Sequence, residues 1–203
     1  MARRQPPTDR ARRAAEMQRQ ARRAERRRSF LIWGGMSLVL LLIVGAIGYA
    51  VLSRPDLSAV KEYEDLGRDH VEGAVEYPQS PPAGGDHNQA WWTCGVYDDP
   101  IPAHHAVHSL EHGAVWLTYR PDISAEEREQ LTELADQDFI LLSPLEDQSS
   151  PVIATAWGKQ LSVDSADDDR LPLFIDEFKQ GPQTPEPGAA CAGGTTTDLA
   201  QSP

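Results

Sequence analysis

The chain has 203 residues and a formal net charge of −12, and its charges are distributed very unevenly. Residues 1–28 hold eleven arginines against three acidic residues, whereas residues 53–203 hold eight basic against twenty-eight acidic residues. The length allows one ordinary domain with extensions. Specific nucleic-acid binding by the Arg-rich segment is not expected, because no aromatic residue or recognised motif accompanies its charge.

The first predicted element is a membrane-spanning helix over Phe30–Leu52, twenty-three residues without a charge. At about 1.5 Å per residue it spans a hydrocarbon core of roughly 30 Å. A cleavable signal peptide has a shorter apolar region of about 7–15 residues and a small-x-small site, which "AVLSRPD" does not offer. The sequence therefore predicts a retained single-pass anchor in the cell membrane, with the bilayer as its partner.

The arginines set the expected orientation of this anchor. By the positive-inside rule, residues 1–29 form a cytoplasmic tail and residues 53–203 lie outside the cytoplasm. The tail is expected to determine topology and to contact anionic lipid headgroups. An acidic cytoplasmic partner is the alternative.

The outer part begins with weakly marked elements and one long loop. Residues 53–66 predict a short helix, and residues 71–77 a brief strand. Residues 78–102 contain too many prolines and glycines for a helix or a long strand. Two tryptophans, Cys94 and His87 inside this loop favour an ordered, packed segment.

More regular elements follow. A helix is predicted over 102–112, since proline suits a first helical turn and Gly113 a helix end. Ser124 and Glu127 have the spacing of a capping box at the start of another helix. A last helix is expected to begin beside Pro172. Strands are predicted from β-branched and aromatic content over 114–121, 139–144 and 151–163.

This order predicts a compact single α+β domain within residues 53–192, with a small mixed sheet and about three helices. The chain is long enough there to bury one hydrophobic core. Residues 193–203 are rich in small and polar residues and are expected to form a flexible tail.

The 102–112 helix carries the most informative pattern, because a stretch of nine of its residues holds four of the six histidines of the chain. At about 100° per residue, its apolar side chains form one stripe and the histidines lie roughly opposite. His108 and His112, one turn apart, can reach the same ion, and His70 and His87 lie in the loops just before the helix. Outside the cytoplasm such imidazole sites usually hold copper or zinc. We therefore predict a copper or zinc site at His108 and His112, completed by His87 or His70.

Two alternatives remain open from the residues alone. The pentapeptide "HSLEH" matches H-x-x-E-H, a zinc-hydrolase signature in which Glu111 is the general base. That mechanism needs a third ligand, such as Glu177, and a substrate cleft for which the domain is small. In the binding module Glu111 would instead orient an imidazole, and no catalytic residue is assigned. The second alternative is a metal-free interaction domain whose polar helix packs under Trp91 and Trp92.

Cys94 and Cys191 are the only cysteines. In an oxidising compartment two cysteines most often form one disulfide, and a bridge over about a hundred residues contributes about 4–5 kcal/mol in the chain-entropy model. Thiolate ligation of the metal beside the histidines is the main alternative. A nucleophilic role for Cys94 is a weaker one, since reactive thiols do not persist there.

Five segments taken together resemble the domain of unknown function 3105 family, whose members are bacterial, often actinobacterial, and often have one N-terminal anchor. They are "YPQSPPAGGDH", "WWTCGVYDDP", "VHSLEHGAVWLTYRP", "SPVIATAWG" and "PEPGAACAGG". The resemblance covers most of residues 60–195 and carries no established activity. His104 and His105 fall outside the motif. The resemblance implies that the following match motif positions: His70, His87, Cys94, His108, Glu111, His112 and Cys191.

Overall fold

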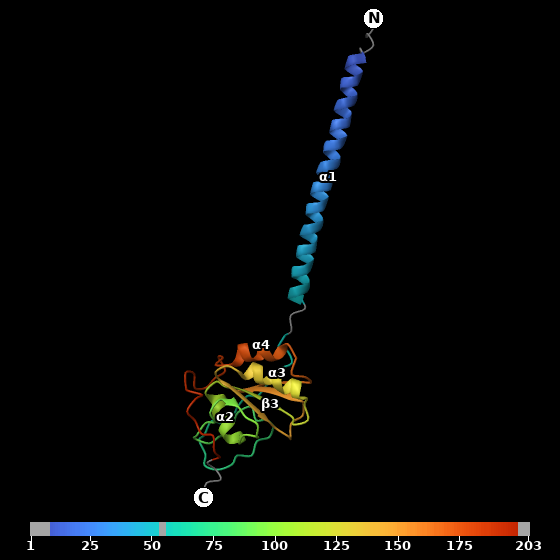
Figure 1. The fold of residues 1–203 in the computed structure, drawn as a ribbon. Helices are drawn as coiled ribbons and strands as arrows, with labels where there is room; N and C mark the ends of the chain where they lie inside the picture. Colours follow the sequence, from blue (N-terminus) through green and yellow to red (C-terminus); the bar gives the residue numbers. More distant parts are fainter. Residues whose placement is uncertain (1–8, 53–55, 199–203) are drawn as a thin grey trace. The chain divides into compact units, whose positions relative to one another are not determined.

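The computed structural model describes residues 9–52 and 56–198 (Figure 1). The chain divides into two compact units, residues 1–54 and residues 55–203. The predicted cytoplasmic segment 1–8, the segment 53–55 and the tail end 199–203 lie outside the described residues.

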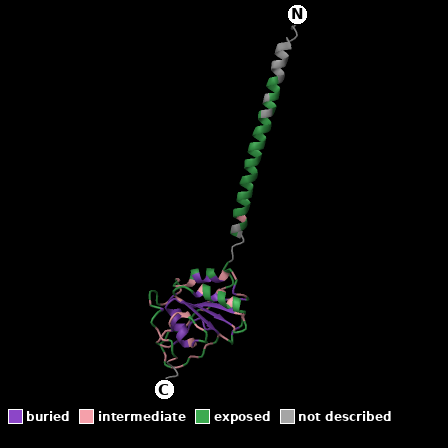
Figure 2. Cartoon of the chain, in the orientation of Figure 1, coloured by how far each residue is buried: buried purple, intermediate pink, exposed green. Residues whose placement is uncertain are grey.

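The first unit is one helix, α1 (Asp9–Leu52). Within it, Met17–Tyr49 is long and apolar enough to cross a membrane. Its large apolar side chains, among them Phe30, Trp33 and Leu41, are exposed (Figure 2). An exposed apolar surface of this extent is typical of segments that contact a membrane or another protein.

The second unit is an α+β domain with a mixed sheet, as the sequence predicted. The sheet has six strands in the order β1-β6-β5-β3-β4-β2. The central strand β3 (Val115–Tyr119) pairs in parallel with β4 (Ile140–Pro144) and antiparallel with β5 (Val152–Ala156). β5 pairs antiparallel with β6 (Lys159–Val163). Two-residue strands, β1 (Lys61–Glu62) and β2 (Gly95–Val96), form the edges.

Three helices complete the domain. They are α2 (Ala103–Glu111), α3 (Ala125–Ala135) and α4 (Arg170–Phe178). α3 begins at the predicted capping box, in which the Ser124 hydroxyl accepts from the Glu127 backbone and the Glu127 carboxylate accepts from the Ser124 backbone. These two contacts satisfy amides that the first helical turn leaves without partners.

Three predicted elements differ from the structure. Residues 151–163, predicted as one strand, fold into the β5–β6 hairpin because Gly158 adopts a φ of +67° and donates its amide to the Ala83 carbonyl at 2.7 Å. Within the described residues 56–66 no helix forms, and β1 occupies part of that segment. The strand predicted over 71–77 is absent, and only a parallel bridge between His70 and His87 forms beside it.

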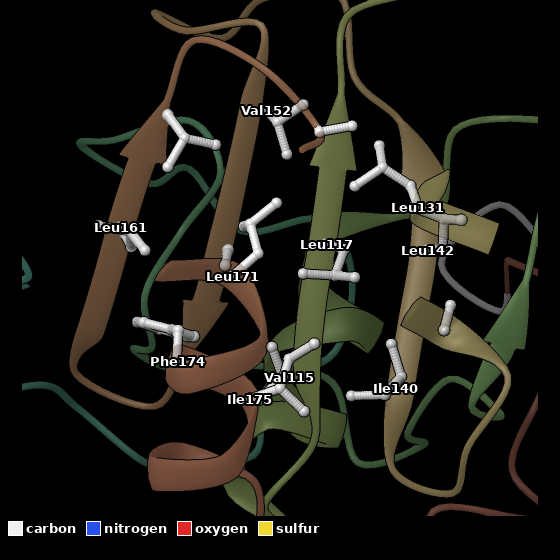
Figure 3. Packing of buried hydrophobic residues seen from close by; sticks show 14 of the residues in the cluster. Val115, Leu117, Leu131, Ile140, Leu142, Val152, Leu161, Leu171, Phe174 and Ile175 are labelled. Atoms are coloured by element: carbon white, nitrogen blue, oxygen red, sulfur yellow. The ribbon is translucent and has the colours of Figure 1, made fainter. Parts of the chain in front are cut away.

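One face of the sheet is covered by α3 and α4 and holds the main apolar core (Figure 3). Because side chains alternate along a strand, Val115 and Leu117 of β3 enter this core while Trp116 between them points to the opposite face. Leu171, Phe174 and other side chains of α4 close the layer.

The opposite face is covered by α2 and by loops on either side of it. Trp116, Leu110 and Trp157 form a second, smaller apolar cluster there. α2 lies on the other side of the sheet from α3 and α4, and it is buried along its length (Figures 1 and 2). This second face positions the histidines.

Candidate metal centre

Helix α2 holds its histidines inside the protein. It starts after Pro102, whose backbone is extended, and Gly113 follows its end with a φ of +96°, a conformation that suits glycine. His104, His105, His108 and His112 are all buried, each at most 6% exposed. The histidine side of the helix is therefore not a solvated polar face, because the preceding loop and the C-terminal segment cover it.

Four imidazoles share one anchoring pattern, in which the Nδ1 atom lies 2.6–2.8 Å from a backbone carbonyl oxygen. A carbonyl oxygen only accepts, so Nδ1 carries the hydrogen and donates it. In the neutral ring the lone pair then lies on Nε2, the arrangement of metal-binding histidines. The pairs are His87 with Gly85, His105 with Ala90, His108 with Asn88, and His112 with Ala190.

The loops bring two further histidine rings to the helix. The amide of Val71 donates to the His87 carbonyl at 2.8 Å, and the amide of His87 donates to the Asp69 carbonyl at 3.0 Å. This places the His70 and His87 rings 5.0 Å apart, and both lie within 4.9 Å of the His108 ring. One ligand atom each from His70, His87, His108 and Glu111 lies within 4.8 Å of the other three, so the four can hold one ion.

At the centre of this group, Nε2 of His87 lies 2.9 Å from Oε2 of Glu111. Both atoms are buried and neither has a hydrogen-bond partner, so this close contact is no hydrogen bond. Since Nδ1 of His87 already carries the hydrogen, Nε2 is an acceptor, and two acceptor atoms lie in contact with no hydrogen between them. Such a contact is repulsive unless a cation lies between the two atoms. Two ligands of one zinc ion, each about 2.0–2.2 Å from it, have a similar separation.

The surroundings favour neutral imidazoles. Burial lowers the pKa of His108 to about 4, and the neighbouring rings of His112, His87 and His70 contribute, although the Asn88 carbonyl opposes the shift. His108 is therefore neutral at neutral pH and offers its Nε2 lone pair. Burial also lowers the pKa of His104, and His105 adds to the effect, although the charge of Asp198 and its hydrogen bond to His104 oppose it.

The predicted residues do not all fall into one group. His70, His87 and His108 come together. The carboxylate of Glu111 lies beside their nitrogens, where it could bind the same ion directly. His112 lies in a different group with His108 and Glu186, where its Nε2 is 3.5 Å from Oε2 of Glu186. Glu177, the third ligand considered for a hydrolase, is exposed on α4 and belongs to none of the groups in the described part of the chain.

Sequence reasoning missed one cluster altogether. His104, His105 and Asp198 form a third group with metal-binding spacing. Asp198 belongs to the segment predicted as a flexible tail, and nothing in the local sequence relates it to a helix more than ninety residues earlier. The cysteine pair was the signal, because a bridge from the loop to Cys191 brings the following residues toward α2.

Cys94 and Cys191 are bonded as a disulfide, with Cα atoms 5.4 Å apart. No thiolate is therefore left for a metal. Beyond the bridge, the Thr195 amide donates to the Trp91 carbonyl at 2.9 Å and its carbonyl accepts from Thr93 at 3.0 Å. The Trp91 ring lies against His108 and His112, whereas Trp92 is part of the apolar cluster.

Comparison with known proteins gives one result. Residues 70–193 match the model of the family described as Protein of unknown function (DUF3105). The chain belongs to this family. No curated protein and no solved structure matches the chain. The matched DUF3105 region contains the complete His70, His87, His108 and Glu111 group and ends before Asp198.

Proposed function

We propose that this DUF3105 domain is a binding module for one divalent zinc or copper ion, held by His70, His87, His108 and Glu111. The observation that carries the proposal is the 2.9 Å contact between the orphaned atoms Nε2 of His87 and Oε2 of Glu111. A proton would only remove the repulsion between these two atoms. A metal ion would in addition bind the converging nitrogens of His70 and His108.

The donor set indicates which ions fit. Three imidazoles and one carboxylate suit Zn²⁺ or Cu²⁺, whereas Cu⁺ prefers sulfur ligands. Both cysteines are in the disulfide, and all three methionines of the chain precede residue 53. We therefore favour a divalent ion over Cu⁺.

The burial of the group favours binding over catalysis. His87 and Glu111 side chains are 0% and 3% exposed, and the His70 side chain, 43% exposed, gives the ion a route in. With four protein donors, a tetrahedral ion keeps no position for an attacking water. Glu111 among the donors and His112 outside the group also differ from the roles that an H-x-x-E-H hydrolase requires.

In the proposed setting, Phe30–Leu52 anchors the domain in the cell membrane, with the arginines on the cytoplasmic side near anionic headgroups. The uncharged length of this segment and the arginine block before it support this topology. The disulfide is in keeping with an oxidising, extracytoplasmic location for residues 56–198.

The test is metal binding by the full-length chain in detergent. After loading with Zn²⁺ or Cu²⁺ and removal of free ion, elemental analysis should detect ion in the wild type. Glu111→Gln should lose the tightest-bound equivalent. An amide oxygen is a weaker metal ligand than a carboxylate, and the amide NH2 group is not a metal ligand. The matched control, Glu186→Gln, removes a carboxylate that is half exposed beside His112 and should keep that equivalent. A wild type without bound ion, or a Glu111→Gln variant with unchanged affinity, contradicts the proposal.

A further inference from the structure

We infer that His104, His105 and Asp198 form a second metal site, for a divalent transition-metal cation, at the start of α2. Oδ1 of Asp198 lies 3.3 Å from Nε2 of His104 and 3.6 Å from Nε2 of His105. Two imidazole nitrogens and one carboxylate oxygen thus converge within the spacing that a single ion spans.

Two buried imidazoles and one carboxylate meet at this place. Nδ1 of His105 donates to the Ala90 carbonyl at 2.6 Å, so Nε2 is the ligand nitrogen of the neutral ring. Nε2 of His104 and Oδ1 of Asp198 form a hydrogen bond at 3.3 Å, which already holds this imidazole and the carboxylate side by side. A divalent cation bound here would take the place of the hydrogen in that pair, because metal ligands must be deprotonated.

The site is built from anchored parts. The His105 side chain is 0% exposed and that of His104 is 8% exposed. Their backbone carbonyls accept from the amides of Trp92 at 3.2 Å and Asn88 at 3.0 Å. Asp198 follows a segment that Thr195 holds by two backbone hydrogen bonds, so both sides of the site are fixed to the same loop.

This site is independent of the proposed one. It shares no residue with the His70, His87, His108 and Glu111 group, so both can be filled at once. The His108, His112 and Glu186 group is different, because it uses His108 and cannot be filled together with the first. We therefore expect two ions per chain and not three.

The number and kind of donors set the expected affinity. Three protein donors leave at least one position for water, and Asp198 is partly exposed, with 21% of its side chain accessible. The second ion should therefore bind more weakly and exchange faster than the first. Imidazole and carboxylate together suit Zn²⁺ and Cu²⁺.

The experiment is a calorimetric titration of the metal-free full-length protein in detergent with Zn²⁺, with elemental analysis as a second count. The wild type should bind two equivalents, one tight and one at least tenfold weaker. Asp198→Asn should lose the weak equivalent and keep the tight one, and His105→Gln should do the same. Asp167→Asn, which removes one charge from an exposed turn beside the opposite core, is the matched control and should keep both.

The outcomes separate the two sites. The second site is overturned if the wild type binds fewer than two equivalents and Asp198→Asn binds the same number. It is also overturned if the wild type binds two equivalents and Asp198→Asn keeps both. If Asp198→Asn loses an equivalent while Glu111→Gln loses none, the second site stands and the first is wrong. Because Asp198 lies near the chain end and is partly exposed, its substitution leaves the fold intact, which circular dichroism checks.

Discussion

The two faces of the sheet are built from the same strands and differ completely in what they bury. On the α3 and α4 side the buried cluster is apolar throughout, from Val115 to Ile175. On the α2 side, five histidines and Glu111 are buried beside a smaller apolar cluster. Burying ionisable groups costs free energy unless they are paired or bind a metal. The comparison teaches that one face supplies the main apolar core, whereas the other buries side chains that could bind a metal.

Loss of the disulfide should have the largest effect on stability, because the bridge attaches the C-terminal segment to the loop beside α2. Replacing both Cys94 and Cys191 by serine should lower the free energy of unfolding by about 4–5 kcal/mol, since the bridge closes a loop of 97 residues. Chemical denaturation of the full-length protein in detergent, followed by tryptophan fluorescence, measures it. Reduced wild type should behave in the same way, and an unchanged midpoint would refute the expectation.

The apolar face should affect stability without affecting ligand binding. Phe174→Ala removes a fully buried ring and should lower the free energy of unfolding by about 3–5 kcal/mol. The folded variant should still bind as many metal equivalents as the wild type. Leu173→Ala, at a partly exposed neighbouring position, is the control and should change stability by less than about 0.5 kcal/mol. A lost metal equivalent in Phe174→Ala would show that the two faces are coupled.

On the α2 side of the sheet, a substitution should weaken metal binding and stabilise the metal-free protein. In metal-free protein, Glu111→Gln should raise the free energy of unfolding by about 1 kcal/mol, because its amide can donate to Nε2 of His87 and end the contact between two acceptors. Thermal unfolding with a chelator present measures this gain. Binding of Zn²⁺ at this site should then stabilise the wild type by about 2.7 kcal/mol at a hundredfold excess over Kd, and the variant by less. A metal-free variant less stable than the wild type would mean that the contact is favourable as it stands.

Much of the fold follows from local patterns. The capping box at Ser124, Gly113 at the helix end and the β-branched strands fix α2, α3 and the central strands by interactions between near neighbours. The hairpin at Gly158 was missed because residues 152–163 contain no proline and look continuous. Its turn depends on an amide that contacts Ala83, far away in the sequence.

The site could be predicted only where the sequence marks it. The histidine spacing on α2 indicated His108, and nearby loop histidines indicated His87 and His70. The helical geometry could not show that loops cover the histidine side, so the burial that holds the rings went unseen. Asp198 and Glu186 come from the C-terminal segment, and their contacts depend on tertiary pairing.

The way the C-terminal segment is attached has a consequence for how the proposed second ion would be held. A tethered ligand acts as if it were present at an effective concentration that falls roughly as the −3/2 power of tether length. The sulfur bridge lies seven residues before Asp198, but Thr195, only three residues before it, is held by backbone hydrogen bonds to Trp91 and Thr93. While these bonds hold, the tether has the same length with or without the bridge, so the effective concentration of Asp198 stays nearly the same. The covalent link thus protects the chain against unfolding far more than it tightens capture of the cation.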